Sequence, residues 1–121
     1  MSDNSYKTDG TIDCFPNRFP GRDYVIEFTA PEFTSMCPMT GQPDFGTITV
    51  SYAPRERCIE LRSFKYYLQT FRDQGIFYED VVNTILDDIV AAIEPAYLEV
   101  SGEFNVRGGI SARITASYPE K

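Results

Sequence analysis

The hydrophobic pattern of this chain changes period twice, and this change constrains the fold more than any other feature. Apolar and polar side chains first alternate, which is typical of strands with one buried face. Apolar residues then recur every three to four positions, which predicts amphipathic helices, before the alternation returns. The expected strands are residues 24–30, 46–53, 98–106 and 110–116, and the expected helices begin after Ser63 and at about Glu79.

This order of strand, strand, helix, helix, strand, strand predicts an α+β domain. We expect an antiparallel four-stranded sheet with two helices packed on one face. An open sheet of this kind has two unpaired edges, which natural proteins seldom leave uncovered. The pattern therefore also predicts that subunits join edge to edge.

Turn and cap residues set the expected element ends. Pro31 is expected to end the first strand, and Ser63 is expected to cap the first helix at its N-terminus. Gly75 and Pro95 are expected to stop the two helices. The preceding residues 1–22 are expected to form a partly flexible lead-in to a single domain over residues 23–121.

Charge and composition restrict the classes of function that this protein can have. The net charge of −7 argues against a nucleic-acid partner held by electrostatics and favours a small-molecule substrate. No apolar run is long enough for a membrane span, so we expect a cytoplasmic protein. The cysteines are Cys14, Cys37 and Cys58; their number and wide spacing suit neither a disulfide framework nor a metal site, and we expect three free thiols.

The chain contains no histidine. This absence excludes a Cys-His or Ser-His-Asp nucleophile system and an imidazole metal ligand. Any acid or base must therefore be a carboxylate, lysine, tyrosine or cysteine.

The chemistry is expected in the loop between the first two strands. Pro38 and Gly41 give this loop a tight, irregular path, and it carries one thiol and one carboxylate. Cys37 is either a small buried core residue or a nucleophile whose proton is managed by Asp44. Cys14 and Cys58 are both interpreted as structural residues without a role in the chemistry.

Two carboxylates have a structural and a functional interpretation. Asp44 is either a turn residue or the proton donor and acceptor beside Cys37. Glu79 is either a first-turn residue favoured by the helix dipole or a group that accepts paired N–H groups from a guanine-like ring.

Several segments together resemble the 7-cyano-7-deazaguanine reductase family, the nitrile reductases of queuosine biosynthesis, in its short single-domain form. The matching stretches read PEFTSMCPMTGQPDF from Pro31, ELRSFKYY from Glu60, FRDQGIFYE from Phe71 and FNVRGGI from Phe104. They span most of the chain. The resemblance implies a tunnelling fold (T-fold) in which subunits join their sheets into a barrel, with two stacked pentameric rings and active sites between subunits.

The resemblance also implies a reaction. In this family the cysteine matching Cys37 attacks a nitrile to form a covalent thioimide, and the aspartate matching Asp44 supplies protons. NADPH then delivers hydride twice, giving the primary amine 7-aminomethyl-7-deazaguanine. Substrate-binding positions match Ile59, Glu60, Leu61, Tyr78 and Glu79, and candidates for the cofactor phosphates are Arg62, Lys65 and Arg107.

The chain departs from the family pattern at a few positions. Tyr78 stands where many relatives have histidine, Asp73-Gln74 replaces an Asn-His pair, and Arg62 stands where lysine is frequent. Two other functions remain open. One is a related amidinotransferase that adds ammonia to the same nitrile on tRNA, and the other is a non-catalytic purine-binding module of the same fold.

Overall fold

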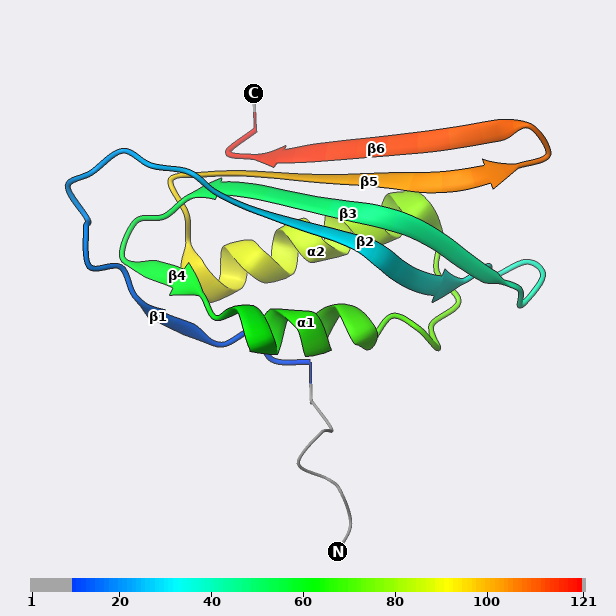
Figure 1. Cartoon of the computed structure of the whole chain (residues 1–121), viewed down its shortest axis with the longest axis horizontal. Coiled ribbons are helices and arrows are strands. Elements are labelled where there is room, and N and C mark those ends of the chain that lie inside the picture. The colour runs from blue at the N-terminus through cyan, green and yellow to red at the C-terminus, as the bar shows by residue number, and fades with distance from the viewer. Residues whose placement is uncertain (1–9, 121) are drawn as a thin grey trace, which may run out of the picture.

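A four-stranded antiparallel sheet dominates the computed structural model, which describes residues 10–120 (Figure 1). The strand order is β2-β3-β5-β6, and a separate two-stranded sheet pairs β1 with β4. The expected flexibility of residues 1–9 lies outside the described part of the chain. The elements are β1 (Cys14–Pro16), β2 (Ile26–Met36), β3 (Pro43–Ala53), β4 (Arg57–Ile59), α1 (Leu61–Gln69), α2 (Tyr78–Ile93), β5 (Tyr97–Arg107) and β6 (Ile110–Tyr118).

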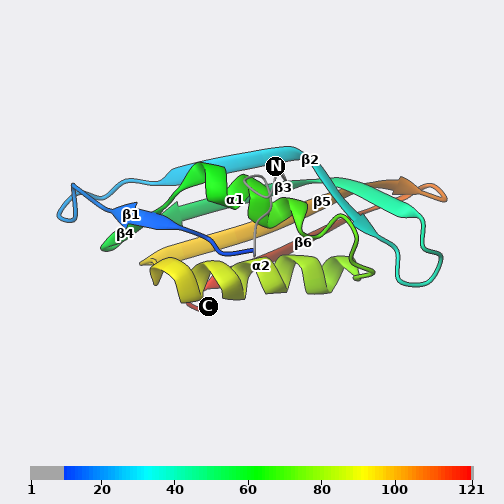
Figure 2. The ribbon, with the colours of Figure 1, turned by 90° about the horizontal axis from the view of Figure 1, so that it is seen from below.

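Both helices lie on the same face of the large sheet, which confirms the α+β class (Figure 2). The longer helix, α2, packs against β5 and β6, while α1 lies beside β2. The apolar stripe expected for α2 is buried, with Val82, Ile85 and Ile89 each at 0% exposure. On the sheet side, the core is formed by side chains of β3 and β5. They include Ile48, Val50, Tyr52, Leu98 and Val100.

The prediction that Pro31 ends the first strand is wrong. Strand β2 runs through Pro31 to Met36, and its pairing with β3 shifts register between Ala30 and Phe33. The irregularity accommodates a residue that has no N–H to donate, and β2 is an outer strand of its sheet, where proline is tolerated. The strand therefore reaches the Cys37 loop directly.

The prediction that Ser63 caps the first helix is also wrong. Glu60 is the N-cap, and its carboxylate accepts hydrogen bonds from the backbone N–H groups of Ser63 at 2.9 Å and Arg62 at 2.8 Å. These N–H donors, the Ser63 one first, lower the pKa of Glu60 because they stabilise its charged form. Ser63 instead donates its hydroxyl proton to the backbone carbonyl of Glu60.

The small sheet was not predicted from the sequence. Residues 14–16 of the expected lead-in pair antiparallel with residues 57–59, just before α1. Tyr52, fully buried in β3, accepts a hydrogen bond from the backbone N–H of Ile59 at 2.9 Å and so joins β4 to the large sheet. Burial raises the pKa of Tyr52 to about 12.

Two glycines open a place in the sheet for one aromatic ring. A Cβ on Gly46 or on Gly102 would lie 2.8 Å from a ring atom of Phe104, so only a residue without a side chain fits at either position. The Phe104 ring, 1% exposed, stacks in turn on the Tyr78 ring at the start of α2, with 3.9 Å between centroids and 5° between planes. The sheet thereby fixes the first residue of α2.

No helix within residues 10–120 is long and apolar enough to cross a membrane.

Candidate active site

The loop after β2 is closed by its own backbone. The N–H of Cys37 donates to the carbonyl of Gln42, and the N–H of Gly41 donates to the carbonyl of Cys37, both at 2.8 Å. Gly41 has a φ of 72°, in the left-handed region that favours glycine. This short closed loop holds the thiol of Cys37, which is half-buried, at the end of the sheet.

A second segment is attached to the end of β2. The N–H of Met36 donates to the carbonyl of Gln74 at 2.9 Å, and the N–H of Ile76 donates to the carbonyl of Met36 at 3.0 Å. Met36 and Gly75 thus form a parallel bridge. A Cβ on Gly75 would lie 3.4 Å from the Cα of Pro38, so the two segments approach closely there. This bridge brings residues 76–79 beside the Cys37 loop.

A cavity of about 330 Å³ lies where these segments meet the ends of β3 and β5. Its volume falls within the range of small-molecule sites. Five residues predicted from the sequence line it together, although they come from four separate segments. They are Cys37, Asp44, Tyr78, Glu79 and Arg107, and the remaining lining residues are Pro38, Thr40, Ile76 and Phe77.

Cys37 is the nucleophile candidate of this pocket, and its surroundings favour the thiolate. A hydrogen bond from the side chain of Thr40 is the main cause that lowers the pKa of Cys37, followed by the backbone N–H groups of Met39 and Thr40. Desolvation and the Asp44 charge act in the opposite direction. A lowered pKa raises the fraction of reactive thiolate at neutral pH.

Replacing Thr40 with valine should raise the pKa of Cys37, because valine has the same shape but no hydroxyl to donate. Alkylation of Cys37 by iodoacetamide should then slow at neutral pH and stay unchanged at strongly alkaline pH, where the thiol is ionised in both proteins. Peptide mass mapping in a Cys14→Ser background measures the rate at this one site. Thr40→Ser keeps the hydroxyl and should behave like the parent protein; a slowing as large as that of Thr40→Val would contradict this explanation.

Asp44 lines the same pocket as Cys37. Its side chain is only 6% exposed, and its Oδ1 atom is 2.9 Å from Nη2 of Arg107. Tyr78 adds a second contact: its pKa is raised, first by desolvation and then by its hydrogen bond to Asp44. A phenol that stays protonated donates to the carboxylate, so Arg107 and Tyr78 both interact with Asp44.

Glu79 lies in the first turn of α2 and is exposed at the pocket wall. A carboxylate at this end of a helix is stabilised by the helix dipole. It carries two acceptor oxygens and faces the same cavity as the thiol. Such a group is suited to accept two parallel N–H groups from a planar ligand.

Five other predicted site residues do not line this cavity: Ile59, Glu60, Leu61, Arg62 and Lys65. Ile59 is 2% exposed and belongs to the core, and Glu60 caps α1. Leu61 and Lys65 line a separate groove of about 340 Å³ between α1 and β2, which Arg72 also borders. Arg62 is exposed on the same helix. The two groups of predicted residues therefore lie in different places within one chain.

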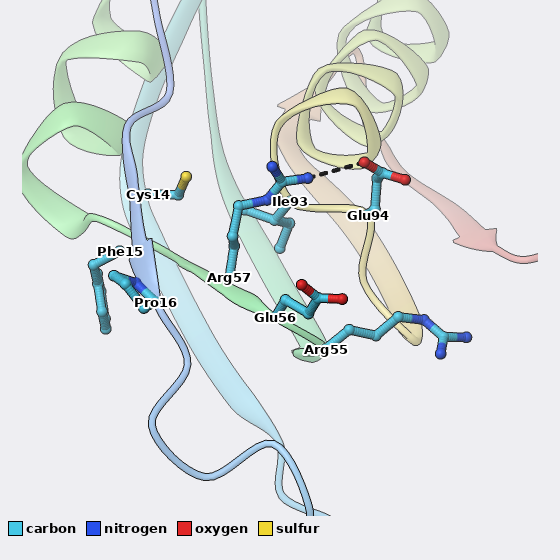
Figure 3. Close-up of a pocket in the computed structure, with 8 residues that line it drawn as sticks. All are labelled: Cys14, Phe15, Pro16, Arg55, Glu56, Arg57, Ile93 and Glu94. Atoms are coloured by element: carbon cyan, nitrogen blue, oxygen red, sulfur yellow. Dashed lines mark hydrogen bonds and ion pairs between the residues drawn. The ribbon is translucent and has the colours of Figure 1, made fainter.

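A third cavity, of about 520 Å³, holds no predicted site residue (Figure 3). Its wall carries two arginines and two glutamates, and Arg57 pairs with Glu94 at 2.9 Å. Cys14 points into this region from β1. Within residues 10–120, no group of three or more His, Cys, Asp or Glu side chains is arranged to hold a metal ion.

Sequence reasoning missed two residues near Asp44. Thr40, whose side chain lowers the pKa of Cys37 most, belongs to the loop motif, but the motif does not show where the Thr40 hydroxyl points. Ser35 pairs with Asp44 across β2 and β3, is 0% exposed, and its hydroxyl has no hydrogen-bond partner among the described residues. Only the register of the two strands places it there.

Comparison with known proteins identifies the family of this chain. The profile of a family described as QueF-like protein matches residues 43–121. The NADPH-dependent 7-cyano-7-deazaguanine reductase of Chlorobaculum tepidum is 57% identical over 107 residues, covering 88% of this chain and 92% of that protein. The protein of the same name from Anaeromyxobacter dehalogenans is 54% identical over 110 residues, covering 91% and 90%.

A solved structure shows the same fold. The crystal structure of the archaeosine synthase QueF-Like in the apo form superposes with a TM-score of 0.73 at 22% identity, covering 77% of this chain and 91% of that one. The fold and the pocket thus define a tunnelling-fold protein with a cysteine and an aspartate in one cavity. More narrowly, the chain belongs to the 7-cyano-7-deazaguanine reductase family.

Proposed function

We propose that this protein reduces the nitrile of 7-cyano-7-deazaguanine to a primary amine with NADPH, in queuosine biosynthesis in the cytoplasm. The observation that carries the proposal is the pocket that joins Cys37, with its lowered pKa, to Asp44 and Glu79. The family membership supplies the substrate and the cofactor, since the relatives are named for both.

The first step proposed is attack of the Cys37 thiolate on the nitrile carbon. A carbon–sulfur bond forms, one π bond of the nitrile breaks, and the nitrogen takes a proton from Asp44, which gives a thioimide. This step converts an unreactive linear nitrile into a C=N centre that accepts hydride. Protonation of the nitrogen avoids a localised anion.

NADPH supplies the hydride, and two equivalents are needed because nitrile to amine is a four-electron reduction. The groove between α1 and β2 suits the cofactor's phosphates, because Lys65 and Arg72 border it and Arg62 lies on the same helix. The first hydride would turn the thioimide carbon into a tetrahedral centre, whose carbon–sulfur bond then breaks to return the Cys37 thiolate and leave an imine; the second hydride would reduce this imine to the amine. The nitrogen takes up a proton as each hydride is added. Asp44 must therefore be reprotonated after each proton it gives, which its small remaining exposure permits.

Substrate recognition is proposed to use residues from two subunits. Glu79 accepts N–H groups of the purine-like ring, while the Tyr78 ring, supported from behind by Phe104, lies beside it. Ile59, Glu60 and Leu61 of the same chain do not line this cavity. If they contact substrate, they come from a neighbouring protomer. Pairing of the outer strands β2 and β6 between subunits would build such a site, in a barrel of two stacked pentameric rings.

The proposal is tested by mixing the protein with the free nitrile base and recording its intact mass. We expect a covalent adduct with the mass of the base, and a fall in NADPH absorbance when cofactor is added. Consumption of ammonia with tRNA and no fall in NADPH absorbance would favour the amidinotransferase instead. Absence of both an adduct and turnover would overturn the enzyme proposal and favour a binding module.

A further inference from the structure

We infer that Ser35 is a positioning residue for Asp44: its hydroxyl accepts a hydrogen bond from the protonated acid and donates one to the carboxylate that remains after proton transfer. This inference rests on the proposed function and deepens it, because it gives a role to a buried group that the proposed reaction leaves unused. Ser35 itself neither gains nor loses a proton.

Ser35 carries a buried hydroxyl that the fold does not use. The residue lies in β2, two positions before Cys37, and is 0% exposed. Within residues 10–120 its Oγ atom has no hydrogen-bond partner. Nearly all buried polar groups in native proteins are paired, because an unpaired one destabilises the fold. A hydroxyl at such a position is therefore expected to serve the site beside it.

The register of the sheet sets Ser35 beside Asp44. The two residues are direct partners in the pairing of β2 with β3, and both are buried. Side chains paired in this way leave the same face of the sheet, with Cβ atoms about 4.5–5.5 Å apart. From there, rotation about the Cα–Cβ bond of Ser35 brings its hydroxyl toward the carboxyl group of Asp44.

The backbone around this pair is held in place on both sides. Strand pairing continues through the flanking residues of β2, and Met36 also forms the parallel bridge with Gly75. The strand therefore has no need to move when Asp44 changes its protonation state. The hydroxyl changes its hydrogen bond by its own rotation, on a rigid element.

The other contacts of Asp44 favour only one of its two protonation states. Nη2 of Arg107 lies 2.9 Å from Oδ1, and the Tyr78 hydroxyl donates to the same carboxylate. Both contacts stabilise the charged form. The proposed reaction also requires the acid form, whose O–H needs an acceptor. A serine hydroxyl both accepts and donates, so Ser35 suits each state.

The experiment compares Ser35→Ala with the parent protein. We expect kcat and the rate of adduct formation to fall about 10-fold, the size of the loss of one hydrogen bond to a reacting group. KM for the nitrile base and for NADPH should stay within about twofold, because Ser35 lines neither the Cys37 cavity nor the groove of α1 and β2. The melting temperature should not fall, since the hydroxyl has no partner to lose.

Two further measurements separate positioning from packing. Alkylation of Cys37 by iodoacetamide should keep the parent rate in Ser35→Ala, because the thiol and its loop are unchanged. In an Asp44→Asn background, Ser35→Ala should cause no further loss of kcat, because the serine acts through Asp44.

Ser51→Ala is the matched control. Ser51 lies on β3 like Asp44, but an odd number of positions away, so its side chain is on the opposite face of the sheet. Its replacement should change neither kcat, nor adduct formation, nor alkylation of Cys37.

Three results would overturn the inference. Parent values of kcat and adduct rate in Ser35→Ala would show that the hydroxyl does not serve Asp44. A lower melting temperature together with slower alkylation of Cys37 would make the serine a packing residue. A loss that persists in full in the Asp44→Asn background would show that Ser35 acts independently of Asp44. Failure of the proposed function looks different, because the unmodified protein would then form no adduct at all.

Discussion

Replacing Cys37 with alanine should abolish both the covalent adduct and NADPH turnover. The reaction proposed here begins with a carbon–sulfur bond, and the other two thiols cannot replace Cys37. Cys14 lies in β1 at a different cavity, and Cys58 is 4% exposed within the core. Since an uncatalysed nitrile does not accept hydride, we expect the residual rate to fall below about one thousandth of the parent rate.

Cys14→Ala is the control for this experiment. It removes the exposed thiol and should leave adduct mass, kcat and KM unchanged. Both variants should melt close to the parent protein, because Cys37 lies in an exposed loop and alanine fits its position. Unchanged NADPH consumption in Cys37→Ala would exclude covalent catalysis at this residue.

Replacing Asp44 with asparagine should lower kcat about 10²- to 10⁴-fold, the contribution typical of general acid–base catalysis. Asparagine has the size of aspartate and still offers an oxygen to Arg107, but it cannot release and regain a proton. The thiol should not lose reactivity. The Asp44 charge raises the pKa of Cys37, so its removal lowers that pKa further and iodoacetamide should modify Cys37 at least as fast as in the parent protein.

These two measurements together distinguish loss of the acid from loss of the nucleophile. Asp87→Asn, which removes an exposed carboxylate from α2, is the control and should have full activity. If Asp44→Asn instead lost alkylation of Cys37 in parallel with turnover, Asp44 would support the loop and would not be the proton donor. Full turnover in Asp44→Asn would exclude any role in proton transfer.

The fold class was predictable because the periods of strands and helices are local properties. The alternation in residues 98–106 and 110–116 predicted β5 and β6, and the apolar stripe of α2 is buried as expected. Pro31 misled the prediction, since whether a proline ends a strand depends on where that strand lies in the sheet. The cap of α1 was missed for a similar reason: glutamate is an unusual N-cap, and the geometry that allows it is tertiary.

What the sequence by itself determined is that a thiol, a carboxylate and turn residues lie together in the loop from Cys37 to Asp44, because all of them fall within eight positions. Only the tertiary structure decided what surrounds them. The parallel bridge of Met36 and Gly75 brings Glu79 to the pocket. Strand pairing brings Arg107 onto the carboxylate of Asp44 and onto the backbone carbonyl of Pro43, which lies 64 residues earlier in the chain. Residue spacing in the sequence does not reveal such contacts, since they depend on strand register and on packing across the whole sheet.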